Sequence, residues 1–240
     1  MPRKPAEPNA RSEATRSSLI AAAMQAFARS GYEAVSTREI ASAAGAHPAL
    51  IGYHFGGKEG LYLAVFEHIA ATMEQRIGPA LAGMGQALAR PGKPAEVAER
   101  SLAMLGTLCD AMVATLADRD TGPWGALMMR EQQSPTAAFD LIYERFMRHV
   151  LGTMTLLVRA VDPARSEESV RLTVISLMGQ MMVFRVARAG AVRHLGWKDI
   201  GPRELSRIQA MLRDNLARLT TPSTLLAGAR RQTPAPRPQA

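Results

Sequence analysis

The chain has 240 residues, enough for one sizeable domain or two small ones with a buried hydrophobic core. Aromatic residues make up only 5%, which is low for an all-β protein, and the single cysteine, Cys109, excludes an intramolecular disulfide and a cysteine-based zinc site. The formal net charge of +8 points to a polyanionic partner, either nucleic acid or an acidic membrane surface.

Apolar residues recur at helical spacing along most of the chain, and no stretch shows the sustained alternation of a half-buried strand. The expected fold class is therefore all-α, with about nine helices. Prolines and charges predict disordered arms over residues 1–13 and 221–240. We see no signal peptide and no run of about 20 apolar residues, so we expect a cytoplasmic protein with no membrane partner.

The first two helices are predicted from an apolar face and a capping motif. Residues 19–27 place Leu, Ile, Met and Phe on one side of a first helix, which ends at Gly31. Residues 36–39, Ser-Thr-Arg-Glu, form a capping-box pattern, in which the serine and glutamate side chains satisfy free backbone amides. A second, short helix should therefore start at Thr37.

Proline and glycine mark the boundaries of the later helices. Pro48 fits the first position of a short third helix that ends near Tyr53. Lys58 opens a long fourth helix that ends at Gly78-Pro79. Five further helices are expected over residues 95–117, 123–133, 135–160, 166–190 and 203–219.

Three short helices followed by a longer one, with a tight turn over residues 44–46, are the arrangement of a helix-turn-helix DNA reader. Val35, Ile40, Ala41 and Ile51 would form a small core that holds the third helix outward. The N-terminal residues of that helix would then enter a major groove and contact base edges.

Residues 14–67 resemble the DNA-binding domain of the TetR family of bacterial transcriptional regulators. The residues that carry the resemblance are Phe27 and Gly31-Tyr32, the T-x-x-x-I-A-x-x-A-G pattern of residues 37–45, and Tyr53-His54-Phe55-x-x-Lys58. Less strongly, residues 130–140 (REQQSPTAAFD) and the helices after them resemble the subgroup described by a CerR-type C-terminal domain.

The resemblance implies a homodimeric regulator, usually a repressor. Such a protein binds a palindromic double-stranded DNA operator and releases it when a small-molecule effector enters the C-terminal domain. The expected division is a DNA-binding domain over residues 14–60 and a ligand-binding and dimerisation domain over residues 61–220.

The family motif also implies which residues contact DNA. Thr37 and Lys58 would bind phosphates, and Tyr53 and His54 would contact the backbone or nearby base edges. The recognition helix has almost no side chain for bidentate hydrogen bonds to bases, so discrimination would rest on Arg38, on apolar contacts with thymine methyls and on DNA shape. The expected contact residues are Arg11, Arg16, Ser36, Thr37, Arg38, His47, Pro48, Ala49, Leu50, Gly52, Tyr53, His54 and Lys58.

Structural alternatives stay open for several of these residues. His47, in the N-cap position of the recognition helix, could cap the helix without touching DNA. His54 could pack the end of the helix, and Lys58 could be a solvated charge. Arg38 suits a base contact and a solvated surface equally well.

Two further sets of residues are predicted in the C-terminal domain. Trp124, Met128, Met178 and Met182 would line an adaptable apolar effector pocket, with core packing as the alternative. Two apolar stripes would build an intersubunit four-helix bundle unless they bury against their own chain. The stripes are Val170, Val174, Leu177, Met181 and Phe184, and Leu205, Ile208, Leu212 and Leu216.

The positive charge is spread along the chain. Residues 1–60 carry seven basic and five acidic side chains, residues 61–220 carry nineteen and sixteen, and the tail adds three arginines. A charge-driven helical protein that binds DNA without sequence preference, or a membrane surface, is therefore the rival interpretation. No Gly-rich phosphate loop, nucleophile elbow or metal-ligand spacing is present, so we expect neither an enzyme nor a cofactor or metal site.

Overall fold

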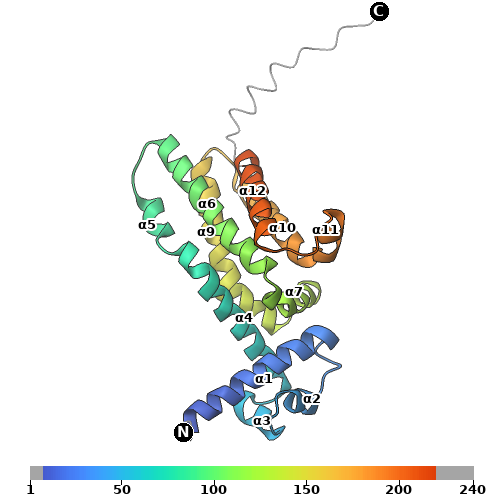
Figure 1. Ribbon diagram of the computed structural model, residues 1–240. Coiled ribbons are helices and arrows are strands. Elements are labelled where there is room, and N and C mark those ends of the chain that lie inside the picture. Colours follow the sequence, from blue (N-terminus) through green and yellow to red (C-terminus); the bar gives the residue numbers. More distant parts are fainter. Residues whose placement is uncertain (1–7, 220–240) are drawn as a thin grey trace, which may run out of the picture. The chain divides into compact units, whose positions relative to one another are not determined.

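The computed structural model describes residues 8–219, which form twelve α-helices, one 3₁₀ turn, one π-helical turn and no strand (Figure 1). The predicted all-α fold class is confirmed. The chain divides into two compact units. One unit comprises the residues up to Gln75 together with Asp118–Arg148, and the other comprises Arg76–Ala117 together with the residues from His149 onward.

The first unit contains the predicted helix-turn-helix. Its fully buried side chains include Phe27 of the first helix, Ile40 of the second, Ile51 of the third and Phe66 of the fourth, so these helices share one small core. The same unit holds a second group of helices from the middle of the chain, and the first helix packs against one of them, α7. Its elements are α1 (Pro8–Ser30), α2 (Thr37–Ala43), α3 (Ala49–Phe55), most of α4 (Lys58–Leu81), η1 (Arg119–Thr121), α7 (Gly122–Gln133), α8 (Ala137–Ile142) and the π turn η2 (Tyr143–Met147).

Two helix ends in the N-terminal half of the chain, the start of α1 and the end of α4, differ from the sequence prediction. α1 begins at Pro8, so residues 8–13 are helical and not part of a disordered arm. The rest of that arm, and the predicted tail over 221–240, lie outside the described residues. α4 continues past Gly78-Pro79 to Leu81, because Ala82 N–H donates to Gly78 O and helical bonding resumes after the proline.

The helix predicted over residues 135–160 is interrupted by a wider turn. Residues 137–161 are helical throughout, but η2 separates α8 from α9 (Arg148–Val161). Within this π turn Arg145 Nε donates to Glu74 Oε1 of α4 at 3.0 Å. Apolar periodicity does not reveal a single π turn, because the helix on either side keeps its buried face.

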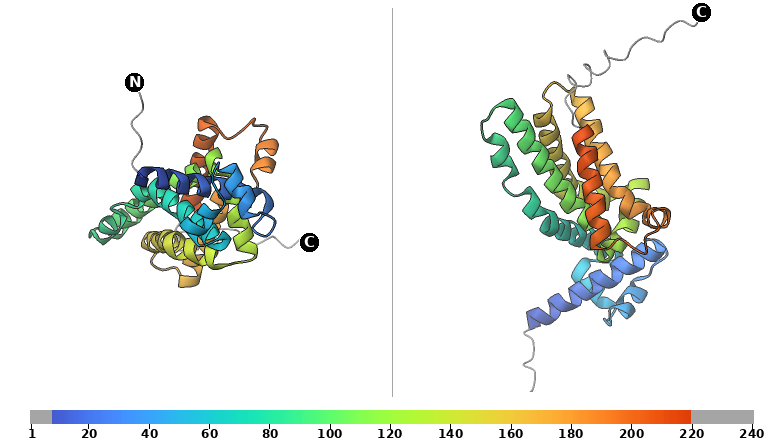
Figure 2. Two further views of the ribbon diagram at one scale, coloured as in Figure 1. Left: turned by 90° about the horizontal axis from the view of Figure 1, so that it is seen from below. Right: turned by 45° about the horizontal axis from the view of Figure 1, so that its top comes forward.

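The second unit is a helical bundle. α10 and α12 lie side by side and both pack against α6 (Figures 1 and 2). The helix predicted over 166–190 ends early, because Ala187 leaves the helical conformation at φ −104° and ψ 25°. The remaining elements are α5 (Met84–Ala89), which the sequence did not predict, α6 (Pro94–Ala117), α10 (Glu167–Val186), α11 (Arg188–His194) and α12 (Pro202–Leu219).

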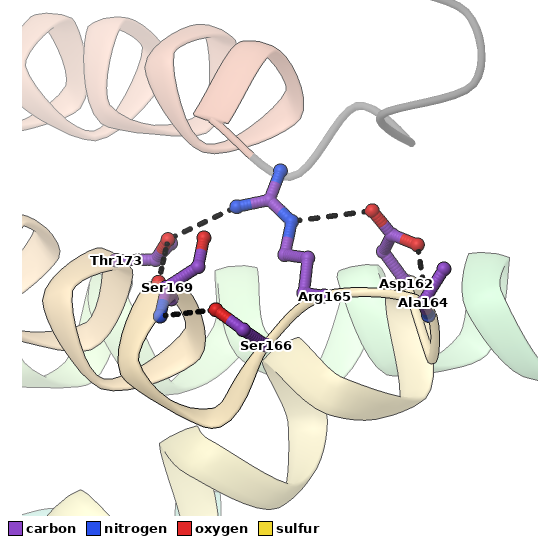
Figure 3. A network of polar contacts seen from close by, with 6 residues as sticks. All are labelled: Asp162, Ala164, Arg165, Ser166, Ser169 and Thr173. Atoms are coloured by element: carbon purple, nitrogen blue, oxygen red, sulfur yellow. Dashed lines mark hydrogen bonds and ion pairs between the residues drawn. The ribbon is translucent and has the colours of Figure 1, made fainter.

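A polar network fixes the turn between α9 and α10 (Figure 3). The Arg165 guanidinium donates to Asp162 Oδ2 at 3.3 Å and to Thr173 Oγ1 at 3.0 Å. Ser166 caps α10 by accepting from the Ser169 N–H at 3.2 Å. Side chains from both ends of the turn are thus tied together, which sets the direction in which α10 leaves.

Candidate nucleic-acid interface

Ser36 and Glu39 form the predicted capping box at the start of α2. Ser36 N–H donates to Glu39 Oε2 at 2.7 Å, and Glu39 N–H donates to Ser36 Oγ at 3.2 Å. The hydrogen bond from the Ser36 backbone lowers the pKa of the Glu39 carboxyl, because it favours the charged form. Thr37 is half-buried in the first turn, whereas Arg38 and, near the start of α1, Arg11 are exposed.

The predicted tight turn joins α2 to α3. Gly45 has a φ of 62°, a left-handed conformation that glycine adopts readily. The N-cap of α3 is Pro48 and not His47, since Ala49 is the first helical residue. His47 Nδ1 nevertheless accepts from the Ala49 N–H at 3.3 Å, so the imidazole satisfies one of the free amides at the helix start.

α3 turns one face inward and the opposite face to solvent. Ile51 is buried, whereas Tyr53 is 80% exposed. Leu50 and His54 are half-buried. The solvent face also includes His47, Pro48, Ala49 and Gly52. This face therefore offers an imidazole and a phenol but no side chain suited to bidentate base recognition, and the DNA contacts themselves stay predictions.

Two of the cations predicted to contact DNA, Arg16 and Lys58, lie against aromatic rings of the same unit. The Arg16 guanidinium lies 5.4 Å from the centroid of the Phe55 ring. Lys58 Nζ lies 4.5 Å from the centroid of the Tyr32 ring and donates to Glu33 O at 3.3 Å. Lys58 is thus half-buried against the α1–α2 connection, which does not fit the alternative of a merely solvated charge.

A buried network that the sequence analysis missed connects α4 with α7 and the start of α8. Tyr62 O–H donates to Glu131 Oε1 at 2.8 Å, and Thr136 donates to Glu131 Oε2 through both its N–H and its hydroxyl, each at 2.9 Å. Burial, and then the hydrogen bond to Glu131, raise the pKa of Tyr62. The only sequence signal was the position of Glu131 within the REQQSPTAAFD segment.

The four residues predicted to line an effector pocket are divided between the two units. Trp124 is buried and Met128 half-buried on α7, whereas Met178 and Met182 are both half-buried on α10. A shared pocket for all four residues stays a prediction.

The residues predicted at the dimer interface form the core of the second unit. Only Leu205 is half-buried; the other eight are buried within the chain, where α10 and α12 pack against α6. The two apolar stripes are therefore buried within their own chain, as the alternative to the four-helix-bundle prediction held. An interface between two copies would have to use other residues. The eight are Val170, Val174, Leu177, Met181, Phe184, Ile208, Leu212 and Leu216.

The opposite face of α10 is apolar and exposed. Leu172 and Ile175 are each about 60% exposed, and Val183, two turns further on, is also exposed. Met211 of α12 adds a further exposed apolar side chain. We call these four residues the α10 face.

α6 and α10 are each long and apolar enough to cross a membrane by length and composition alone. Half of the apolar window of α6 and a third of that of α10 are buried inside the fold, and one or two such helices are weak evidence for a membrane span. The sequence analysis predicted no membrane-spanning run, and polar residues interrupt the apolar run of α6. Within residues 8–219, no group of three or more His, Cys, Asp or Glu side chains is placed to hold a metal ion.

Comparison with known proteins agrees with the helix-turn-helix geometry. Residues 19–65 match the family described as bacterial regulatory proteins, tetR family, and residues 103–221 match the C-terminal domain of the HTH-type transcriptional dual regulator CecR. The dual regulator CecR of Shigella flexneri is 33% identical over 186 residues, which are 77% of this chain and 82% of that protein. The chain belongs to the TetR family. The matching C-terminal domain is that of CecR, which corrects the expected subgroup name CerR.

Other TetR-family relatives agree with this assignment. The HTH-type transcriptional repressor NicS of Pseudomonas putida is 34% identical over 61 residues, 25% of this chain and 29% of that protein. A TetR-like regulator from Rhodococcus sp. RHA1 superposes with a TM-score of 0.58 at 17% identity, covering 90% of this chain and 97% of that one. FadR of Bacillus halodurans, a fatty acid degradation regulator, gives 0.56 at 16% identity, covering 89% and 96%. The two structures establish the shared fold.

As a TetR-family member with an outward recognition helix, the chain is a DNA-binding transcriptional regulator. The relatives described here are transcriptional regulators and not enzymes. Nothing in the fold or the comparisons favours the rival interpretation of a charge-driven binder without sequence preference.

Proposed function

We propose that this TetR-family protein is a repressor that binds a palindromic DNA operator as a homodimer and releases it when a small-molecule effector binds. The outward face of α3 carries this proposal, because Ile51 anchors the helix while Tyr53 points to solvent. Residues 14–60 would read the DNA, and residues 61–220 would bind the effector and dimerise. The protein would act in the cytoplasm, without enzymatic activity or a cofactor.

The homodimer would use the α10 face. Its side chains come from adjacent helices, α10 and α12, and an exposed apolar surface of this kind is a common site of association. Two-fold symmetry would present two α3 helices to successive major grooves about 34 Å apart, which explains a palindromic operator.

Release by an effector needs differential binding. A ligand shifts the equilibrium only if it binds the DNA-free conformation more tightly than the DNA-bound one. Trp124, Met128, Met178 and Met182 are the residues proposed for the pocket, since flexible methionine side chains adapt to varied apolar ligands.

The operator proposal is tested by fluorescence anisotropy with DNA that flanks the protein's own gene. We expect saturable, salt-sensitive binding to a palindromic fragment, and a loss of about tenfold for Tyr53→Ala, within the range for a groove contact. The control replaces the tail residues Arg230, Arg231 and Arg237 by glutamine and should leave the preference for the palindrome intact. An effect of Tyr53→Ala no larger than that of the control, with no sequence preference, would establish the charge-driven alternative.

A further inference from the structure

A cleft of about 670 Å³ opens within the first unit, beside the Tyr62–Glu131 network. The end of α1, the first turns of α4, and α7 with the start of α8 provide its walls. This volume lies within the 300–1,000 Å³ typical of small-molecule sites. The cleft does not include any of the four residues proposed above for the effector pocket.

One wall of the cleft contains a buried carboxylate without a cationic partner. Glu131 is only 2% exposed, and it acts as acceptor in all three of its hydrogen bonds, from Tyr62 O–H and from Thr136 N–H and O–H. A group that only accepts hydrogen bonds matches the ionised form of the carboxyl. Among residues 8–219 it forms no ion pair, although buried charges in proteins are ordinarily paired.

Two further carboxylates lie at the same cleft. Glu33 and Glu59 are both exposed, and neither forms an ion pair in the described part of the chain. After burial, their negative charges are the causes that raise the pKa of the neighbouring Tyr32, whereas the charge of Arg130 acts in the opposite sense on Tyr62. The three carboxylates at the cleft outnumber the one cation in its described lining. The one cation in the described lining, Arg130, places its guanidinium against Gly31.

The cleft also contains aromatic rings suited to a cation. Tyr32 and Tyr62 pack edge to face with centroids 5.0 Å apart, and both line the cleft. The Tyr32 ring already has the Lys58 ammonium 4.5 Å from its centroid. Aromatic faces and carboxylates together are the usual surroundings of a bound organic cation.

We infer that this cleft is a binding site for a small organic cation with N–H donors, such as an amidinium or a primary ammonium, whose charge is neutralised by Glu131, Glu33 and Glu59. A planar amidinium can donate two parallel hydrogen bonds to a carboxylate. In the cleft it would compete with the Tyr62 hydroxyl for Glu131 Oε1.

The consequence for regulation rests on the proposed ligand-released function. Tyr62 lies one turn into α4, the helix that follows the recognition helix, and its ring also packs 5.2 Å from that of Phe27 in α1. A cation that displaces Tyr62 from Glu131 loosens α4 and α1 from α7. Binding would therefore lower the affinity for the operator.

The site is tested first without DNA, by isothermal titration of the full-length protein with benzamidinium, benzamide and benzoate. These three probes are nearly equal in size and differ in charge. We expect benzamidinium to bind with a Kd of about 1 mM or tighter, and the other two to bind at least about fivefold more weakly. The overall charge of +8 favours benzoate, so a preference for the cation must come from local carboxylates.

Two variants identify the carboxylates. Glu33→Gln with Glu59→Gln removes two exposed charges without touching the buried network, and should weaken benzamidinium binding by about fivefold to tenfold. Glu13→Gln removes an equally exposed charge from α1 outside the cleft, and should change nothing. Glu131→Gln should abolish the preference over benzamide if the variant folds, as judged by its circular dichroism.

Equal binding of benzamidinium and benzoate, or equal binding by the double variant and the wild type, overturns the site. A second titration measures operator binding with benzamidinium present. If the probe binds the cleft but leaves the operator affinity unchanged, the regulatory coupling is wrong while the site stands. Absence of operator binding without any probe would contradict the proposed function alone.

Discussion

The Tyr62 hydroxyl donates a hydrogen bond to Glu131 Oε1 at 2.8 Å, and so joins α4 to α7 through two residues that lie 69 positions apart in the sequence. The same tyrosine ring packs against Phe27 and Tyr32, at centroid distances of 5.2 and 5.0 Å. Helices α1, α4 and α7 therefore meet at one side chain. The DNA-reading part of the first unit is attached to its middle-chain helices through this residue.

The first prediction concerns this hydrogen bond. Tyr62→Phe keeps the ring packing but leaves a buried carboxylate oxygen without its donor, which should lower the free energy of unfolding by about 1–3 kcal/mol. Tyr143→Phe is the matched control, because Tyr143 is 36% exposed and its hydroxyl has no hydrogen-bond partner among residues 8–219. Urea unfolding followed by circular dichroism measures both variants. Equal stabilities for the two would show that the Tyr62 hydroxyl contributes nothing.

Alkaline pH should destabilise the protein through its single thiol. Burial raises the pKa of Cys109 from its ordinary value of 9.0 to about 12. Between these values the unfolded chain loses the thiol proton while the folded chain keeps it, so stability is complete below pH 9 and falls as the pH rises towards 12. The expected loss is about 1.4 kcal/mol for each pH unit in this window.

The Cys109→Ala variant isolates this contribution. It should be less stable than the wild type near neutral pH, because it removes a buried side chain, but its stability should fall less steeply above pH 9. The difference between the two slopes, measured by denaturant unfolding at several pH values, is the quantity of interest. Parallel slopes would contradict the prediction.

The sequence was sufficient for the features that local patterns encode. The capping box at Ser36 and Glu39, the turn at Gly45 and the outward direction of α3 all follow from residues close together in the chain. The interactions that stabilise these features join residues within one or two helical turns of each other. The family motif of residues 37–58 therefore predicted the geometry of the helix-turn-helix.

Tertiary relationships were not available from local patterns. An apolar stripe such as Val174 to Phe184 indicates a buried face but does not say whether the same chain or a second copy buries it. Here α6 covers that stripe, and the exposed Leu172 and Ile175 lie on the other side of α10. Likewise, glutamate is ordinarily a surface residue, so the sequence gives no sign that Glu131 is buried. Its hydrogen-bond partners Tyr62 and Thr136 explain the burial.

The network in Figure 3 predicts a contrast between a buried and an exposed ion pair. The side chains of Arg165 and Asp162 are only 10% and 6% exposed, so Asp162→Ala leaves a largely buried guanidinium and should cost about 2–4 kcal/mol. In the control, Arg171→Gln breaks a pair with Glu167 whose side chains are 70% and 60% exposed, and should cost less than about 0.5 kcal/mol. Thermal unfolding of both variants measures the contrast. Similar costs would mean that the α9–α10 turn is not held by this pair.

The α10 face predicts how the proposed homodimer can be broken. Ile175→Asp places a charge in the centre of the proposed interface and should convert the dimer into a monomer, because an unpaired charge in an apolar contact is costly. Leu156→Asp on α9 is the control, since Leu156 is exposed to a similar degree but lies outside the α10 face. Light scattering after size-exclusion chromatography reports the mass. A dimer that survives Ile175→Asp would exclude this face as the interface.

The last prediction concerns whether Arg38 contacts a base, which would give sequence preference, or a phosphate, which would not. This arginine is the exposed cation in the first turn of α2, and α3 offers no side chain for bidentate base recognition. Arg38→Gln should weaken operator binding by about tenfold or more while affecting random DNA much less, because a base contact contributes about 1–3 kcal/mol of discrimination. Arg29→Gln, which removes an exposed charge from the last turn of α1, should change both affinities only slightly. Anisotropy titrations at two salt concentrations distinguish the outcomes, since an equal loss on operator and random DNA would identify Arg38 as a phosphate contact.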